Sequence, residues 1–370
     1  MKPAEVVLCK SEYSGKSSFS SFLSRCFLAS PNDFEPLKFE YIGVKIMALT
    51  IKEAVRKWGP EYLAICGLAK YFPVMNSESH VFFVDGTDGV GDDGVNTGGQ
   101  LPDEPFLTIT KALSECTSAK NDFIFILNYY QATGETWPIS ISKGQVHIIG
   151  IGYSSGPWNW VQPTGDTAAF SLTTGADGVE IAGLEIGAGA THAGIEMATS
   201  GLWNLHVHDC GFGTENGMTG AYGIRTSDGT NGGELINALI ENNRFGRQLT
   251  ASGIEVPAAL TGPNDVEGCI IRNNKFEVAT GNVGINVPKT TASFADGGIF
   301  NNTFLVPAEA GAAITFGAGT TGIVDGNRAY MLDESTILTA EVYRTGADGM
   351  SWGQNYVSGT LLLLETDYTA

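Results

Sequence analysis

The sequence repeats with a period of about thirty residues between Gly194 and Tyr330. One series consists of isoleucines after a glycine or alanine, at positions 195, 224, 254, 285 and 314, which lie 29, 30, 31 and 29 residues apart. A second series ends in phenylalanines at positions 212, 245, 276 and 304, which lie 33, 31 and 28 residues apart. Two independent motifs with one period indicate a repeat architecture.

The residues between these motifs predict the type of repeat. They form short β-prone segments, such as Ile195-Glu196-Met197, which Gly, Asn or Pro soon interrupts. No segment has the 3.6-residue periodicity that a helical repeat requires. Because side chains alternate along a strand, each isoleucine would point inward and the next residue outward, with successive coils about 4.8 Å apart. The pattern predicts an all-β solenoid, a parallel β-helix.

Asparagine recurs at one position of the coil. Its copies are Asn243, Asn274, Asn302 and Asn327, and Cys210 takes this position in the first coil. Asparagine tolerates the left-handed backbone of a sharp bend, and stacked side-chain amides can bond from coil to coil. We therefore interpret this row as a structural ladder rather than as a ligand-binding row.

These repeats resemble those of the pectate-lyase-like right-handed β-helix superfamily, whose coils carry an asparagine ladder at one bend. The resemblance extends from about Val81 to Tyr330 and implies a right-handed, single-stranded parallel β-helix. It does not imply one activity, because the fold carries lyases, hydrolases, phage tailspikes and inert structural proteins.

Four segments are predicted along the chain. They are an N-terminal arm or extension at 1–46, a helical docking segment at 47–80, the β-helix at 81–330, and a C-terminal cap or oligomerisation segment at 331–370. In the second segment, a capping box opens a short helix at 50–58, and Pro60 begins another through about residue 70. Leu361 to Leu364 predict a final strand that either caps the stack or, the alternative we favour, pairs with a neighbour.

The β-helix is predicted to begin with a strand at 81–85, an Asp/Gly turn and a helix. This helix has Ile109, Ala112, Leu113 and Cys116 on one face. By resemblance to the superfamily, it would plug the open first coil and hide its strand edges. Buried strands are expected at 123–127, 146–149, 170–172 and 179–181.

The Asp/Gly turn is a candidate calcium site. Its carboxylates are Asp85, Asp88, Asp92 and Asp93. Several carboxylates in a glycine-rich loop supply the oxygen ligands that calcium prefers, although their spacing is not that of an EF-hand. Because Asp and Gly are also good turn residues, a purely structural role is the favoured interpretation.

Two groups of residues are candidates for catalysis. The residue after each repeated isoleucine gives an outward column in which Glu196 and Glu255 lie two coils apart, about 9.6 Å, with Arg225 between them. Such a carboxylate pair suits glycoside hydrolysis, but it also suits an exposed charge ladder. The second group is His206, His208 and Asp209, in which the histidines share one side of a strand and would form a metal or catalytic pair, or be surface histidines.

Composition limits the partners. The net charge of −19 argues against a nucleic-acid surface or an anionic membrane. The six cysteines lack a CxxC motif, which favours free thiols. No signal-peptide pattern follows Lys2, and Leu361 to Leu364 are too short to span a bilayer.

These observations favour a non-enzymatic structural or interaction protein without a cofactor. By resemblance, we expect a phage virion component, a capsid decoration or a tail spike or fibre, which assembles as a homotrimer in the host cytoplasm and contacts other virion proteins through its N-terminal segment. The alternative is a polysaccharide depolymerase, a hydrolase or lyase acting on bacterial surface glycan. A lectin-like adhesin lies between the two.

Overall fold

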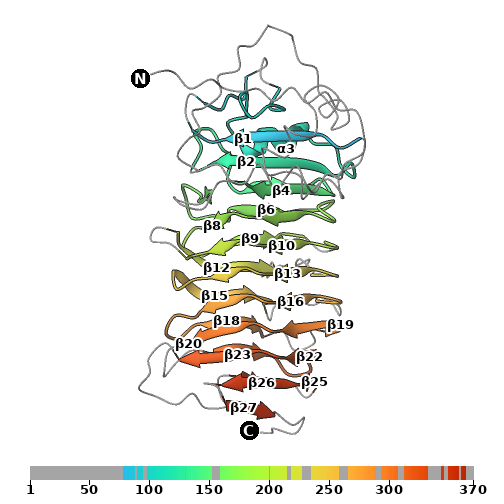
Figure 1. Cartoon of the computed structure of the whole chain (residues 1–370), viewed down its shortest axis with the longest axis vertical. Helices are drawn as coiled ribbons and strands as arrows, with labels where there is room; N and C mark the ends of the chain where they lie inside the picture. The colour runs from blue at the N-terminus through green and yellow to red at the C-terminus, as the bar shows by residue number, and fades with distance from the viewer. Residues whose placement is uncertain are drawn as a thin grey trace, which may run out of the picture. The chain divides into compact units, whose positions relative to one another are not determined.

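The structure is a computed structural model, and the chain winds in it as a right-handed parallel β-helix (Figure 1). It describes residues 78–87, 90–94, 98–129, 131–151, 159–199, 201–214, 218–226, 235–257, 266–288, 293–306, 312–331, 343–345, 349–357 and 360–363. Over these residues the predicted all-β fold class is confirmed.

Most coils of the described chain contribute one strand to each of three sheets. Sheet 1 contains β1 (Val81–Asp85), β2 (Asp122–Asn128), β4 (Val146–Gly150), β7 (Glu180–Ala182), β10 (His206–His208), β13 (Leu239–Glu241), β16 (Ile270–Arg272), β19 (Ser293–Phe300), β22 (Thr321–Asp325) and β25 (Gly349–Trp352). Sheet 2 contains β5 (Trp160–Val161), β8 (Glu185–Ile186), β11 (Gly211–Phe212), β14 (Arg244–Phe245), β17 (Lys275–Glu277), β20 (Thr303–Val306), β23 (Arg328–Met331), β26 (Gln354–Val357) and β27 (Thr360–Leu363). Sheet 3 contains β3 (Ile139–Ile141), β6 (Phe170–Leu172), β9 (Ala193–Met197), β12 (Gly220–Thr226), β15 (Leu249–Glu255), β18 (Val283–Val287), β21 (Ala312–Phe316) and β24 (Tyr343–Thr345).

The two repeated motifs form two columns inside the coils. The isoleucine column is aligned by the register of sheet 3, in which Ile224 pairs with Ile195 and Ile254, and Ile285 with Ile254 and Ile314. All five side chains are fully buried. The phenylalanine column is a stack whose successive ring centres are 4.9, 4.6 and 4.8 Å apart, close to the spacing of the strands. The thirty-residue period is therefore the length of one coil.

The predicted asparagines lie in one buried row at the corner between sheets 1 and 2. In each coil the side-chain Nδ2 donates to the Oδ1 of the next asparagine at 3.0 Å, from Asn243 to Asn274 and onward. The same Oδ1 accepts the backbone N–H of the preceding asparagine at 2.9–3.0 Å. Nδ2 also donates to a backbone carbonyl within the preceding coil's sheet 1 strand, such as Val207, the middle residue of β10, for Asn243. The row continues to Asn355, which the sequence pattern did not indicate.

The left-handed backbone lies one residue before the ladder, and its assignment to the ladder asparagines is wrong. Positive φ angles of 56°, 56° and 53° occur at Asn242, Asn273 and Asn301. Two adjacent residues at this corner therefore have different roles. The first adopts the tight bend, and the second points inward, where its amide makes the bonds between coils.

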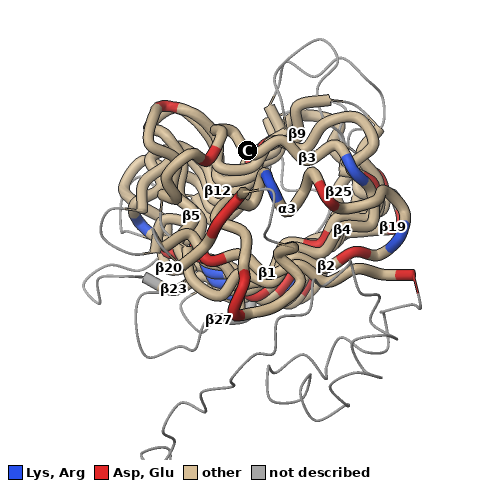
Figure 2. Tube along the Cα trace, turned by 90° about the horizontal axis from the view of Figure 1, so that it is seen from above, with Lys and Arg blue, Asp and Glu red and all other residues tan. Residues whose placement is uncertain are grey.

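The first coils are closed by α3 (Ile109–Glu115), as predicted from one apolar face. Ile109, Ala112 and Leu113 are buried against the strands, and Thr108 caps the helix by accepting the N–H of Lys111. Looking along the coil axis, Figure 2 shows α3 over the central space. The buried apolar side chains of the coils fill this space. The strands predicted at 123–127, 146–149 and 170–172 are present as β2, β4 and β6, and β7 begins one residue later than predicted.

The coil continues beyond Tyr330, where the sequence analysis placed its end. β24 pairs with β21, β25 with β22, and β26 with β23, all in parallel. The repeat is hidden there because Ile gives way to Tyr343 and Phe to Val357 at the inward positions. The predicted final strand is β27, which pairs antiparallel with β26 of the same chain.

Three cysteines of the described chain, Cys116, Cys210 and Cys269, are free and buried. Burial raises the pKa of Cys210 and of Cys269 to about 12, which keeps both as unreactive thiols. The segment at 1–46, the helices predicted at 50–58 and 60–70, Asp88 and the remaining cysteines lie outside the described residues. Within the described part of the chain, no helix has the length and apolar character needed to cross a membrane.

Replacing one ladder asparagine should weaken the stack, whereas replacing its neighbour should not. Asn274→Ala removes the acceptor of the buried Asn243 backbone N–H and one bond each from the Asn243 amide, the Asn302 amide and the Ile240 carbonyl, so we expect the free energy of unfolding to fall by about 3 kcal/mol. Asn273→Gly is the matched control, because glycine accepts the positive φ, and it should change stability by less than about 1 kcal/mol. Chemical denaturation of both variants measures the difference, and equal losses would contradict the structural ladder.

Candidate functional site

The outward column of sheet 3 has the composition that the sequence predicted. Register aligns Arg225 with Glu196 on one side and Glu255 on the other, followed by Asn286 and Thr315. The two carboxylates are therefore two strands apart, with a guanidinium in the interval. A hydrolase needs that interval for the sugar and its attacking water.

Both carboxylates of this column are engaged by neighbouring protein groups. Oε1 of Glu196 lies 3.0 Å from Nδ1 of His192 and accepts the backbone N–H of Ala193 at 3.1 Å. Oε2 of Glu255 accepts the hydroxyl of Ser252 at 2.9 Å and Nδ2 of Asn286 at 2.8 Å. These bonds fix Glu196 within its own coil and hold Glu255 to both its own coil and the next.

Arg225 and Glu255 differ in their surroundings. The guanidinium carbon of Arg225 lies 4.6 Å from the ring centre of Tyr222, in cation–π geometry. Glu255 is 9% exposed, and burial raises its pKa. The bonds from Ser252 and Asn286 and the charge of Arg225 oppose this effect only in part. A raised pKa is the property of a general acid, which makes Glu255 a candidate for that role.

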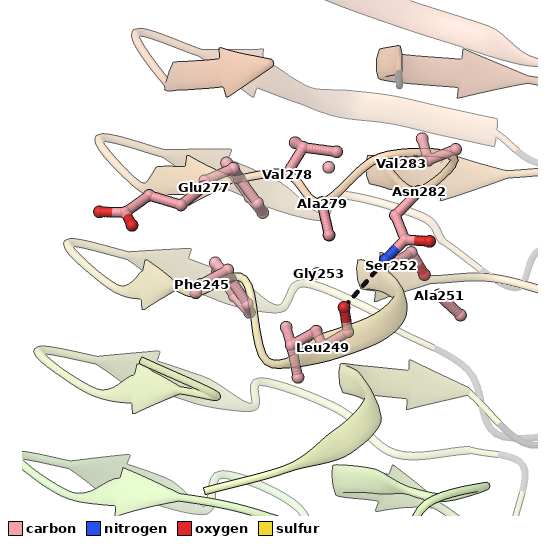
Figure 3. A pocket seen from close by; sticks show the side chains of 13 residues that line it. Phe245, Leu249, Ala251, Ser252, Gly253, Glu277, Val278, Ala279, Asn282 and Val283 are labelled. Atoms are coloured by element: carbon pink, nitrogen blue, oxygen red, sulfur yellow. Dashed lines mark hydrogen bonds between the residues drawn. The ribbon is translucent and has the colours of Figure 1, made fainter. Parts of the chain in front are cut away.

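A small hollow lies beside this column, between β14, β15, β17 and β18 (Figure 3). Its wall is largely apolar and includes Phe245, Leu249 and Val283. Asn282 closes one side by donating Nδ2 to the carbonyl of Leu249 at 2.9 Å. The free volume of about 10 Å³ is roughly that of one water molecule, so the hollow does not admit a sugar ring.

The outward face of sheet 1 carries a network of ionisable groups, which we call the histidine cluster. It consists of His147, Glu180, His206, His208, Asp209, Glu241 and Arg272. The register places His147, Glu180 and His206 in one column and His208, Glu241 and Arg272 in the next. The predicted pair of histidines therefore lies among groups from the coils on both sides.

Glu180 is the centre of the histidine cluster. Its Oε2 lies 2.5 Å from Nδ1 of His147, and its Oε1 lies 2.7 Å from Nε2 of His208. The other ring nitrogen of His208, Nδ1, is 2.8 Å from Asp209. Nε2 of His206 is 3.2 Å from Glu241, which in turn accepts a bond from Arg272 at 2.8 Å. The rings of His206 and His208 lie against each other with centres 4.2 Å apart.

This geometry moves the pKa values of the cluster in opposite directions. Burial alone would raise the pKa of Glu180, but its bonds to His147 and His208 outweigh burial and lower the pKa far below its usual range. Burial and the neighbouring His208 lower the pKa of His206. Burial also acts to lower the pKa of His208, but the bonds to Glu180 and Asp209 raise it overall. The two histidines therefore differ in protonation over the same pH range.

His206, His208 and Asp209 were predicted as a candidate site from the sequence, whereas the other members of the cluster were not. A usable signal was present, since Glu180 precedes His206 by 26 residues and Arg272 follows Glu241 by 31, each about one coil. The repeat motifs become recognisable only from Gly194, so β4 and β7 had no register in the sequence. The strands that pair with β4 and β7 could therefore not be assigned from the sequence alone.

The Asp/Gly turn uses its described carboxylates for backbone bonds. Asp85 accepts the N–H of Thr87, Asp92 that of Gly94, and Asp93 those of Leu107 and Thr108. Such bonds occur in turns and at the start of a helix. Calcium binding at this turn stays a prediction.

Comparison with known proteins gives one match. The model of a family described as Protein of unknown function (DUF1565) matches residues 90–341, which is more than half of the chain. The matched range includes both the histidine cluster and the outward column of sheet 3. No curated protein and no solved structure matches the chain.

The raised pKa of Glu255 predicts that replacing this residue changes stability by an amount that depends on pH. Its ionised form is penalised in the folded protein, so this group's contribution to stability is present at acid pH and is lost as pH rises through the folded pKa. Glu255→Gln should therefore unfold at an equal or higher denaturant concentration than wild type at pH 7. The gain should disappear below about pH 4, where both states of the wild-type residue are protonated.

Glu277→Gln is a control for which the expected change in stability has the opposite sign. Burial acts to raise the pKa of Glu277, but bonds from Lys275 and Arg244 at 3.0 and 3.1 Å lower it overall. This substitution should destabilise the protein at pH 7, and its effect should disappear only as pH falls through the lowered pKa of the folded state. Denaturation of both variants at pH 7 measures the two signs, and a loss for Glu255→Gln at pH 7 would contradict the assignment.

Proposed function

We propose that this chain, which belongs to the DUF1565 family, is a non-enzymatic structural or interaction protein that uses its β-helix as a rigid module. The observation that supports this most is the outward column of sheet 3. There the best candidate pair of catalytic carboxylates, Glu196 and Glu255, is separated by Arg225 and bonded to neighbouring protein groups. The stacked rings and the bonded ladder also favour a stiff support over a site that opens and closes.

A surface suited to association lies on sheet 1, C-terminal to the histidine cluster. We call it the sheet 1 apolar patch, and it consists of Leu239, Ile270, Phe300 and Ile323. His206 on β10 pairs with Leu239 on β13, and Leu239 pairs with Ile270 on β16. Ile323 lies in the same column two strands beyond Ile270, on β22. Ile323 is 47% exposed, and the other three are half-buried. Partly exposed apolar side chains gathered on one sheet face favour contact with another protein surface.

Within this class we place the chain among virion proteins, as a capsid decoration or a tail spike or fibre. What supports this is the resemblance of the repeats to those of phage β-helices, together with the acidic charge of −19 and the buried thiols. On this proposal the protein is a homotrimer that associates through the sheet 1 apolar patch. Its outer walls would face other virion proteins or bacterial surface glycan.

A second candidate function is a polysaccharide depolymerase. The raised pKa of Glu255 favours it, since a buried carboxyl of this kind can act as a general acid. Glu196 would then be the second carboxylate, about 9.6 Å away across two strand spacings, near the upper limit for an inverting hydrolase.

Glycan cleavage separates these two functions. We expect the purified full chain to leave bacterial capsular and lipopolysaccharide preparations intact, and Glu196→Gln and Glu255→Gln to behave like wild type in binding to cells. Chromatography of the glycan before and after incubation measures cleavage. Cleavage by wild type that Glu255→Gln abolishes would overturn the structural function in favour of the depolymerase.

Association through the sheet 1 apolar patch predicts a fixed oligomer. Light scattering of the full chain should give the mass of three copies, and Ile323→Lys should lower that mass because a charge enters the contact. Val90→Lys is the control, since Val90 is 54% exposed but lies in the turn after β1, and it should leave the mass unchanged. A monomeric wild-type chain, or a mass that both variants change equally, would contradict this contact.

A further inference from the structure

We propose that Glu180, His206 and His208 form a binding site for a divalent transition metal ion of the zinc class. Among the described residues, these three form a group that can each turn one ligand atom toward a common point, with those atoms within 4.8 Å of one another. They come from adjacent strands, Glu180 from β7 and both histidines from β10. Two imidazoles and one carboxylate make a common ligand set for zinc, iron, cobalt or nickel.

Each proposed ligand is held in place by a second residue, which bonds to the ligand atom that would not coordinate the metal. His208 bonds to Asp209 through Nδ1, which leaves Nε2 for the metal. His206 bonds to Glu241 through Nε2, which leaves a lone pair on Nδ1. Metal-binding histidines usually donate their other ring nitrogen to a carboxylate in this way, which fixes the ring and its tautomer.

The third ligand is positioned in the same manner. Oε2 of Glu180 is bonded to His147, whose ring is stacked on Phe123 with centres 4.2 Å apart, and Oε1 faces Nε2 of His208 at 2.7 Å. A metal ion would replace the proton shared between Oε1 and Nε2, with a small widening of that contact. The proton is released to solvent as the ion binds.

The charges around the site favour a dication. Glu180, Asp209 and Glu241 carry three negative charges, and Arg272 is the cation bonded among them. With neutral histidines, the cluster therefore has a net charge of about −2, which a divalent ion neutralises. The overall charge of −19 also concentrates cations near the protein surface.

The site is open enough for an ion to enter but is not a loose surface cluster. The side chains of Glu180, His206 and His208 are 14%, 33% and 15% exposed. Three protein ligands leave a fourth position for water, as in zinc sites that are not fully closed by protein. Nitrogen donors distinguish this site from the all-oxygen sites of calcium and magnesium.

The chain supplies a matched control within its own sequence. His192 and Glu196 lie 3.0 Å apart on sheet 3, so they form a histidine–carboxylate pair without the second imidazole. If affinity depends on three converging ligands, a substitution there should not affect it. A general attraction of metal to surface histidines would affect both places.

Zinc titration of the full chain, purified without a polyhistidine tag, tests the proposal. Calorimetry should show one high-affinity ion per chain. His208→Gln, His206→Gln and Glu180→Gln should each reduce the affinity at least about tenfold, while His192→Gln should leave it unchanged. No stoichiometric binding, or equal losses in His192→Gln and His208→Gln, would overturn the site.

Cobalt substitution identifies the donor atoms independently of these variants. Co²⁺ bound by imidazole and carboxylate gives only weak visible bands, whereas cysteine thiolate adds an intense ultraviolet charge-transfer band. We expect the first spectrum, its loss in His208→Gln, and a higher thermal midpoint with added zinc in wild type alone. An intense thiolate band would assign the metal to the cysteines and overturn the proposal.

Discussion

Every feature of this protein depends on the parallel register between one coil and the next. In sheet 3 that register places the isoleucines of successive coils above one another, and the outward neighbours follow automatically. A shift by one residue would turn the buried isoleucines to solvent and bring Glu196, Arg225 and Glu255 inside, at the cost of several unpaired buried charges. The apolar columns therefore determine where the charged columns lie.

The corner between sheets 1 and 2 shows how one short turn serves two requirements. A tight bend needs a residue that accepts positive φ, and Asn242 and Asn273 meet this need with little strain. The next residue points into the interior, where an unbonded amide would be costly, and the ladder gives each amide partners in neighbouring coils. Cys210 begins the row with a thiol instead, and its Sγ lies 3.6 Å from the carbonyl of Ile181, the position that the later amides bond.

The sequence sufficed for features that repeat and failed for features that do not. Equal spacing of Ile195, Ile224 and Ile254 was enough to predict the fold and the order of the sheet 3 column. The histidine cluster was only partly predictable, because β4 and β7 precede the recognisable repeats and the alignment of Glu180 with His206 depends on the actual length of that coil. At the C-terminal end, Tyr343 and Val357 replace the expected isoleucine and phenylalanine, so the last coil has the geometry of the repeat without its motif.

One outward column of sheet 1 changes character along the stack. From β4 to β10 it presents His147, Glu180 and His206, and from β13 to β22 it presents Leu239, Ile270, Gly298 and Ile323. The inward positions beside this column stay uniformly aliphatic, so the core does not require the change. A sheet face that only kept the protein in solution would need neither a network of partly buried histidines nor an apolar strip. The two surfaces adjoin on one rigid sheet, since His206 pairs with Leu239, and Ile323 at the far end of the patch lies four strands from β10.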